Sequence, residues 1–441
     1  MYKFYGGVHP SASKILTLDR PIKRPYIPKK VVLPLLQNVG FPAEPVVKED
    51  DTVSVGQVIA KPSGRMSSAI HATISGKVTK IEHSHTPAHS RVLSVTIEAQ
   101  GDEDQDLNLK APSDIDSLSK ETFLDMIRDA GIVGLGGAMF PAHVKLSPPK
   151  TKPVDTVILN GSECEPYLTC DHRIMIEKSK ELLKAVEIMV RILDAKHAYI
   201  AIEDNKLSAI YAMERALQTA KDKGYKTPVE VISLGTKYPQ GAEKQVIKAV
   251  TNRVVPSGGL PADVGCVVFN VGTAYAIYEA VYLGKPLIER VVTITGPCVR
   301  EPMNLWVRIG TRLEALASVF GGFVKEPKKV IIGGPMMGVA QYAMDIPITK
   351  GVGGVVFLSR DNIVESVESV CIRCGRCIEV CPMGLVPTTL MYQVKLENFT
   401  ASGDLGIADC FECGACAYIC PAKIPLLDYM KYGKSKVVVP V

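Results

Sequence analysis

The sequence predicts a multidomain α/β protein, and three observations lead to this prediction. A chain of 441 residues corresponds to roughly three domains at about 150 residues per domain. Apolar residues first form short alternating runs and later alternate between strand and helix periodicities. Eight of the twelve cysteines lie beyond Asp361. These features indicate several structural units of different architecture.

Composition and charge exclude several classes of function. A formal net charge of +5 is too weak to indicate nucleic-acid binding, and one Trp with 10 Phe leaves few rings for base stacking. No apolar signal-peptide segment follows Met1. The longest uncharged stretch, Val264 to Tyr278, is shorter than the ~20 residues of a spanning helix and predicts a buried strand that passes into a helix. We therefore expect the cysteines to bind metal rather than form disulfides.

The first part of the chain predicts a β domain over residues 1–110. Short alternating runs at Thr52–Ala60 and Ile70–Val78 are typical of strands. They resemble the barrel-sandwich fold of biotinyl and lipoyl carrier domains. The stretch between them, Lys61 to Ser68, lacks the Met-Lys-Met of the carriers, so we expect the carrier shape without a modified lysine. An acidic and polar stretch from Asp102 to Asp116 predicts a linker after this domain.

An α/β domain is predicted over residues 115–287. Apolar residues from Ile174 to Leu193 recur at helical spacing after a β-branched run at Val154–Leu159. Strand and helix patterns then alternate, which favours a largely parallel sheet. The further segments are Ala198–Ile202, Leu207–Lys223, Val229–Leu234 and Ala242–Val250.

A smaller α+β module is predicted over residues 288–350. Short β runs at Val291–Ile294 and Val330–Ile332 flank a helical pattern at Arg312–Val319. Glycine and proline interrupt the module on both sides of that helix.

Two identical cysteine motifs predict two [4Fe–4S] clusters in a ferredoxin-like domain over residues 355–436. Each motif has the spacing C-x2-C-x2-C-x3-C-P of two-cluster bacterial ferredoxins, in which the fourth cysteine binds the other cluster. Zinc is the alternative metal, but it prefers two separated C-x2-C pairs. The predicted ligand sets are Cys371, Cys374, Cys377 with Cys420, and Cys410, Cys413, Cys416 with Cys381. We expect the four other cysteines to be buried or incidental thiols.

Two segments of the α/β domain have the character of ligand loops. The first is a glycine-rich run from Gly134 to Gly137 with Lys145 downstream, where the backbone can approach a phosphate. By itself such a run does not establish a nucleotide site. The second, Asn160 to Pro166, directly follows a predicted strand, which is where open α/β sheets bind ligands. A polar turn with two solvated carboxylates is its alternative explanation.

These loops resemble the flavin and NADH loops of the 51-kDa subunit of respiratory complex I. The resemblance implies that FMN and NAD(H) bind without a catalytic acid–base residue, because hydride passes directly between the two cofactors. It also implies that residues 288–350 form a soluble-ligand-binding β-grasp. The cofactor-binding residues carried over from that family are Gly134, Gly136, Gly137, Phe140, Lys145, Asn160, Ser162, Glu163, Glu165, Tyr238, Gly241, Glu243, Asn270 and Thr273. Of these, Phe140, Glu163, Glu165 and Glu243 are expected to face the dinucleotide.

The order of the predicted domains, after an opening Phe4-Tyr5-Gly6-Gly7-Val8-His9-Pro10, resembles the C subunits of Rnf ion-translocating ferredoxin:NAD oxidoreductases. This resemblance implies an oxidoreductase subunit of the translocase type, with FMN exchanging hydride with NAD(H) and two [4Fe–4S] clusters relaying single electrons. It also implies membrane-embedded, flavin-carrying and ferredoxin-like partner subunits, exchange with ferredoxin through them, and Na⁺ or H⁺ transport by those partners. We expect peripheral binding at the cytoplasmic face of the membrane.

Two alternatives to this function remain open from the sequence. A flavin and iron–sulfur cobalamin reductase would share the flavin loops and the clusters. A non-catalytic electron conduit would keep the clusters but lose flavin chemistry, and the presence of Lys145, Glu163 and Glu165 argues against it.

Overall fold

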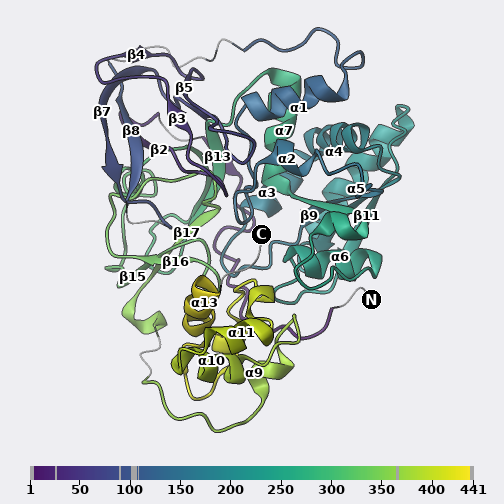
Figure 1. Cartoon of the computed structure of the whole chain (residues 1–441). Helices are drawn as coiled ribbons and strands as arrows, with labels where there is room; N and C mark the ends of the chain where they lie inside the picture. Colours follow the sequence, from purple (N-terminus) through teal and green to yellow (C-terminus); the bar gives the residue numbers. More distant parts are fainter. Residues whose placement is uncertain are drawn as a thin grey trace.

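The computed structural model describes residues 4–24, 27–88, 91–100, 107, 109–363 and 367–437. Of the expected linker at residues 102–116, residues 102–106 and 108 lie outside the described residues, and the rest of it contains neither helix nor strand. Figure 1 shows two β-rich parts on one side, an α/β part beside them and a helical C-terminal part below. The architecture is therefore the mixed, multidomain α/β type that the sequence predicts.

The N-terminal β part consists of two small antiparallel sheets. The expected strands near Thr52–Ala60 and Ile70–Val78 are confirmed, because both sheets draw on them. One sheet contains β2 (Lys30–Pro34), β8 (Val92–Glu98), β7 (Gly76–Ser84) and β4 (Thr52–Val53); the other contains β3 (Glu44–Pro45), β5 (Val58–Lys61) and β6 (Ile70–His71).

A four-stranded parallel sheet forms the centre of the α/β part, in the order β11-β10-β9-β12. Its strands are β9 (Thr156–Gly161), β10 (His197–Glu203), β11 (Val229–Leu234) and β12 (Cys266–Asn270). Asn160 of β9 lies opposite Asn270 of β12 in the register. The carboxyl ends of these two strands therefore meet at one edge of the sheet, where α/β proteins bind ligands.

Helices cover the sheet as the periodicity predicts, with one correction. The helix expected at residues 174–193 is two helices, because Lys178 adopts φ −129° and ψ 27° and interrupts the helical path. The helices are α1 (Lys120–Asp129), α2 (Ala142–Lys145), α3 (Cys170–Glu177), α4 (Ser179–Leu193), α5 (Leu207–Asp222), α6 (Glu243–Thr251), the 3₁₀ helix η1 (Pro261–Val264) and α7 (Val271–Leu283).

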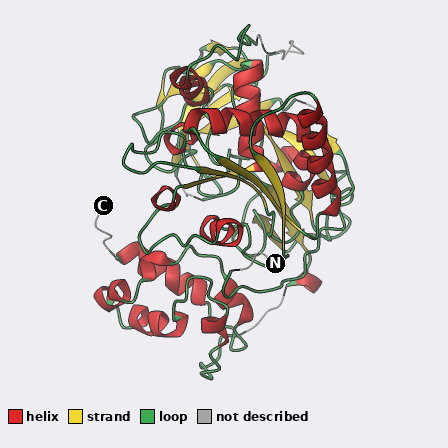
Figure 2. Ribbon diagram, turned by 90° about the vertical axis from the view of Figure 1, so that its right-hand side faces the viewer, coloured by secondary structure: helices red, strands yellow, loops and turns green. Residues whose placement is uncertain are grey.

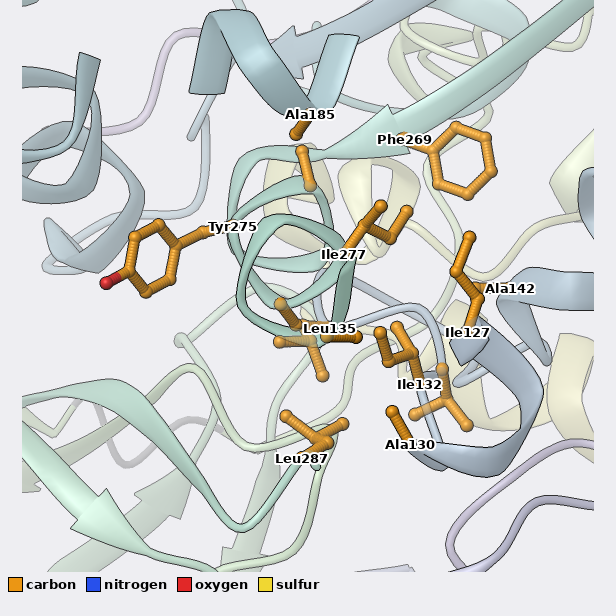
Figure 3. Packing of buried hydrophobic residues seen from close by; sticks show 14 of the residues in the cluster. Ile127, Ala130, Ile132, Leu135, Ala142, Ala185, Phe269, Tyr275, Ile277 and Leu287 are labelled. Atoms are coloured by element: carbon orange, nitrogen blue, oxygen red, sulfur yellow. The ribbon is translucent and has the colours of Figure 1, made fainter. Parts of the chain in front are cut away.

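Helix α7 passes through the core of the α/β part. The sequence predicts a strand passing into a helix across Val264–Tyr278, and β12 followed by α7 confirms this prediction. Figure 3 shows Ile277 of α7 pointing towards Phe269, with Leu135 and Ile132 below the same helix. All four of these side chains are buried in the same hydrophobic cluster, so the glycine-rich loop that contains Leu135 is anchored against α7.

A six-stranded mixed sheet forms the third part, in the order β1-β14-β13-β17-β15-β16. The central strand β17 and the edge strand β1 come from outside the 288–350 span, so the sheet extends beyond the expected module. The expected helix at residues 312–319 is the shorter α8 (Leu313–Leu316). The strands are β1 (Ile22–Lys23), β13 (Glu289–Thr295), β14 (Met303–Arg308), β15 (Lys329–Ile332), β16 (Val339–Gln341) and β17 (Gly354–Leu358).

Lys350 connects this third part to the N-terminal β part and to the α/β part through hydrogen bonds. Its buried ammonium donates to the hydroxyl of Ser68 at 3.1 Å and to the carbonyls of Ala69 at 2.8 Å and Gly131 at 2.7 Å. Burial lowers the pKa of this lysine to about 7. One side chain thus hydrogen-bonds the N-terminal β part and the loop that follows α1.

The C-terminal part is helical and has its own hydrophobic core, which includes Leu390, Ile407 and Met430. Figure 2 shows these helices as a separate layer beneath the sheets. The helices are η2 (Arg360–Asn362), α9 (Arg376–Glu379), α10 (Pro387–Lys395), α11 (Phe399–Asp404), η3 (Ile407–Asp409), α12 (Ala415–Ile419) and α13 (Leu426–Lys436). Across the described ranges, none of the helices has both the length and the apolar character needed to span a bilayer.

Candidate functional site

The glycine-rich loop is fixed to the first turn of α7. The amide of Gly134 donates to the Phe140 carbonyl at 2.9 Å, and the amide of Leu135 donates to the Thr273 hydroxyl at 2.8 Å. At Gly136 a Cβ atom would lie 2.6 Å from the side-chain amide of Asn270. Only glycine allows this close approach, so the loop and the end of β12 form one rigid unit.

The outer face of the same loop is open. Gly136, Gly137 and Ala138 are exposed, and a Cβ atom on Gly137 would have no described atom within 4 Å. The backbone there can therefore be approached closely from solvent. Exposed amides of small residues beside a lysine suit a phosphate group, and this arrangement fits FMN.

Lys145 is the last residue of α2, the short helix that follows the glycine-rich loop. Its ammonium forms an ion pair with Glu243 at the start of α6 and lies 5.4 Å from the centre of the Phe269 ring. The lysine side chain is 25% exposed, so the charge remains accessible. Lys145, Glu243 and Phe269 are thus brought together from three separate segments.

Asn160 connects two of the predicted loops at the end of β9. Its side-chain amide donates to the Gly241 carbonyl at 2.8 Å, and its side-chain oxygen accepts from the Ser162 amide at 3.0 Å. The Ser162 hydroxyl donates to the Ala201 carbonyl at 3.4 Å. These predicted residues therefore hold the loops in shape through their own hydrogen bonds.

Asn270 and the buried Asp171 form a polar pair behind the glycine-rich loop. Asn270 caps α7 by accepting from the Gly272 and Thr273 amides. Its side-chain amide donates to Asp171 at 2.6 Å. Burial, together with the nearby Glu163, raises the pKa of Asp171 to about 7.

The structure gives the two glutamates of the second loop protein partners. Glu163 is buried and accepts from the amides of Asp171 at 2.9 Å and His172 at 3.3 Å, in the first turn of α3. Glu165 accepts from the amides of Met336 at 2.7 Å and Met337 at 3.1 Å. Burial raises the pKa of Glu165, and those two amides oppose the rise. Both carboxylates thus anchor backbone within the protein.

Tyr238 faces the C-terminal part. Its hydroxyl donates to the Cys413 carbonyl at 2.7 Å, and the residue is 2% exposed. Its backbone pairs with Val8 in an isolated antiparallel bridge. The structure therefore places this predicted cofactor residue between the α/β part, the N-terminal segment and the second cysteine motif.

Cysteines from both motifs line one small cavity in the C-terminal part. Three come from the first motif and one from the second, together with Thr388 and Leu426. Cys374 is exposed, whereas Cys377 and Cys420 are buried. The four cysteines are Cys371, Cys374, Cys377 and Cys420. Four thiols around a common space fit the ligand set of a cubane cluster.

The remaining four motif cysteines lie close enough together to change one another's pKa values. Burial, together with the nearby Cys410 and Cys381 thiols, raises the pKa of Cys413 to about 12. Burial likewise raises the pKa of Cys416, and the nearby Cys413, Cys410 and Cys381 thiols contribute to the rise. The fourth cysteine of the first motif thus lies among the first three of the second motif, which fits a crossed ligand set.

Sequence reasoning missed two contributors to this region. Arg290 of β13 is buried and donates to the Leu135 carbonyl at 3.0 Å. In a turn of the third part, the backbone amides of Met336 and Met337 donate hydrogen bonds to Glu165. No local sequence pattern predicts either contribution, because each residue hydrogen-bonds to a different domain. The expected incidental thiols Cys170, Cys266 and Cys298 are buried, and Cys164 is half-buried.

Comparison with known protein families agrees with this architecture. Four family descriptions match in chain order: "RnfC Barrel sandwich hybrid domain" at residues 2–102, "Nuo51 FMN-binding domain" at 127–279, "SLBB domain" at 291–340 and "4Fe-4S dicluster domain" at 370–424.

Similarity to curated relatives extends over almost the whole chain. The chain is 48% identical to the C subunit of the proton-translocating ferredoxin:NAD(+) oxidoreductase complex of Clostridium ljungdahlii, over 98% of this chain and 93% of that protein. It belongs to the RnfC family. Another member, the C subunit of the Na(+)-translocating ferredoxin:NAD(+) oxidoreductase complex of Acetobacterium woodii, is 41% identical over 99% of this chain and 97% of that protein.

Among solved structures, an NAD+-reducing [NiFe]-hydrogenase in the H2-reduced state matches with a TM-score of 0.50 and 15% identity. The match covers 73% of this chain and 63% of the hydrogenase chain. At that identity the likeness shows a shared fold. For this member of the RnfC family, it agrees with the α/β architecture around the parallel sheet.

Proposed function

We propose that this chain binds FMN and two [4Fe–4S] clusters and exchanges electrons between NAD(H) and ferredoxin as the C subunit of an Rnf complex. The observation that carries the proposal is the hydrogen bond from Tyr238 to the Cys413 carbonyl. It joins the α/β part that contains the glycine-rich loop to a cysteine motif. Electron transfer requires such close contact between flavin and cluster domains.

The residues of the glycine-rich loop and its neighbours supply the flavin site in this proposal. The exposed backbone of Gly136 and Gly137 would receive the phosphate, and Lys145 would neutralise its charge. Thr273 and Asn270 fix the loop from behind. When bound, FMN accepts a hydride from NADH and releases the two electrons one at a time.

The two cysteine motifs have different surroundings. This difference supports an order in which electrons pass through the two clusters. The second motif contacts the α/β part through Tyr238 and the third part through Gly414, where a Cβ would lie 2.8 Å from the Met336 carbonyl. Cys374 of the first motif is exposed. We assign the cluster held by Cys410, Cys413, Cys416 and Cys381 to the inner position, next to the flavin site. The cluster of the first motif then faces the partner.

The partners follow from the names of the relatives. Both relatives belong to ferredoxin:NAD(+) oxidoreductase complexes that translocate protons or Na⁺. We propose that this chain docks on membrane-embedded and ferredoxin-like subunits at the cytoplasmic face, and that those partners carry the ion.

Anaerobic preparation of the full chain tests the proposal. Iron and acid-labile sulfide should approach about eight of each per chain, and bound FMN should be bleached by NADH. Flavin that binds but is not bleached by NADH would favour an electron conduit, and a colourless zinc protein would exclude the cluster assignment.

A further inference from the structure

Tyr238 makes the hydrogen bond that connects the α/β part to the second cysteine motif. A carbonyl oxygen can only accept, so the phenol is the donor to Cys413 over 2.7 Å. The proton of the Tyr238 hydroxyl therefore points to the cysteine loop.

The position of Tyr238 is fixed by contacts on several sides. Its amide donates to the Val8 carbonyl at 2.9 Å, and its carbonyl accepts from the Val8 amide at 2.8 Å. The side chain packs in a hydrophobic cluster with Val8, Met336 and Ala415. Because both backbone and ring are constrained, the hydroxyl is presented to the cysteine loop at little cost in conformational entropy.

The hydrogen bond acts on a peptide group that belongs to the cluster loop. The Cys413 carbonyl shares its peptide group with the amide of Gly414, so a donor at the oxygen polarises that N–H. Donors around cluster sulfurs stabilise the reduced, more negative state and raise its reduction potential.

The first cysteine loop offers an internal comparison. Gly375 and Gly414 occupy equivalent places in the two motifs, and both have a φ of 75°. A Cβ on Gly375 would meet no described atom within 4 Å, whereas one on Gly414 would lie 2.8 Å from the Met336 carbonyl. The local loop conformation is shared, so the difference between the two loops comes from tertiary contacts such as that of Tyr238.

We propose that Tyr238 is a positioning residue that raises the reduction potential of the cluster held by the second motif. This inference rests on the proposed two-cluster function. In this proposal Tyr238 acts on the cluster loop and does not bind a nucleotide.

Tyr238→Phe in the full, anaerobically prepared chain tests the proposal by redox titration of both clusters, followed by electron paramagnetic resonance. One cluster should become harder to reduce, by up to about tenfold in the reduction equilibrium, or 59 mV for a one-electron couple. The other cluster and the FMN content should not change. Cys374→Ser alters only the first ligand set, so the resonance signal that it changes belongs to the cluster of the first motif. The other signal is then the one that Tyr238→Phe should shift.

Tyr418→Phe is the matched control. Tyr418 lies on α12, close to Cys416, and is 48% exposed. Its hydroxyl has no hydrogen bond among the described residues, so neither cluster should respond. Replacing Tyr238 by 3-fluorotyrosine, a stronger donor of nearly the same shape, should shift the same cluster in the opposite direction.

Two sets of outcomes separate the possible failures. If wild-type protein titrates with two clusters and neither Tyr238→Phe nor the fluorinated variant shifts one selectively, the role of Tyr238 is overturned. Equal shifts of both clusters, or shifts equal to those in Tyr418→Phe, overturn it as well. If the wild type itself lacks two clusters, the proposed function fails.

Discussion

The side-chain amide of Asn270 donates a hydrogen bond to the buried carboxyl group of Asp171 over 2.6 Å. The same asparagine caps α7, through its side-chain oxygen. One residue therefore stabilises a helix start and a buried acid directly behind the exposed glycine-rich loop. This double role gives the first two predictions.

Asn270→Ala should destabilise the flavin-free protein more than the loss of an ordinary helix cap. Cap removal costs about 1 kcal/mol, and leaving Asp171 without its donor adds about 1–3 kcal/mol. Asn398→Ala is the matched control, because Asn398 caps α11 in an exposed position. Scanning calorimetry should show the larger loss for Asn270→Ala, and equal losses would contradict the double role.

Asp171→Asn should weaken the pH dependence of stability. The pKa of Asp171 is about 7 in the folded chain, against 3.8 as the ordinary value. As the pH rises from 3.8 towards 7, the unfolded chain loses its proton first, so stability falls across this window. Urea unfolding from about pH 5.5 to 8 should show this fall in wild type and a smaller one in the variant. The same slope in both proteins would mean that Asp171 ionises normally.

Gly137→Val should lower FMN affinity without lowering the stability of the flavin-free protein. A Cβ atom at this position meets no described protein atom within 4 Å, so we expect the valine to obstruct a bound ligand and not the protein itself. Lys145→Ala should weaken FMN binding by about 1.5–3 kcal/mol, the range for a hydrogen bond to a charged group. Lys152→Ala, which removes an exposed ion pair with Asp263, is the control. Flavin fluorescence titration measures all three variants, and full affinity in Gly137→Val would move the site elsewhere.

Cys381→Ala should remove the cluster of the second motif although Cys381 belongs to the first. Iron should fall from about eight to about four atoms per chain. Cys298→Ala, at a buried cysteine outside the motifs, should retain all the iron. Electron paramagnetic resonance should show that the cluster lost in Cys381→Ala differs from the one lost in Cys371→Ala. Loss of the same cluster in both variants would contradict the crossed ligand sets.

Local patterns in the sequence determined the type and order of most elements. The β-branched run at Val154–Leu159 predicted β9, and the uncharged stretch from Val264 predicted β12 and α7. The spacing of the cysteines carried the cluster prediction, because three ligands of a cubane lie within seven residues of one another. Periodicity and ligand spacing are short-range properties, so one sequence is enough to reveal them.

Tertiary structure alone decided which predicted residues act together. Glu165 and Tyr238 belong to motifs that the sequence associates with a cofactor, yet their polar atoms contact Met336, Met337 and Cys413. Likewise, β17 lies at the centre of the third sheet although it follows the expected module. These contacts join residues more than 100 positions apart or strands from different segments. Their formation depends on the packing of whole domains, which no local pattern in the sequence encodes.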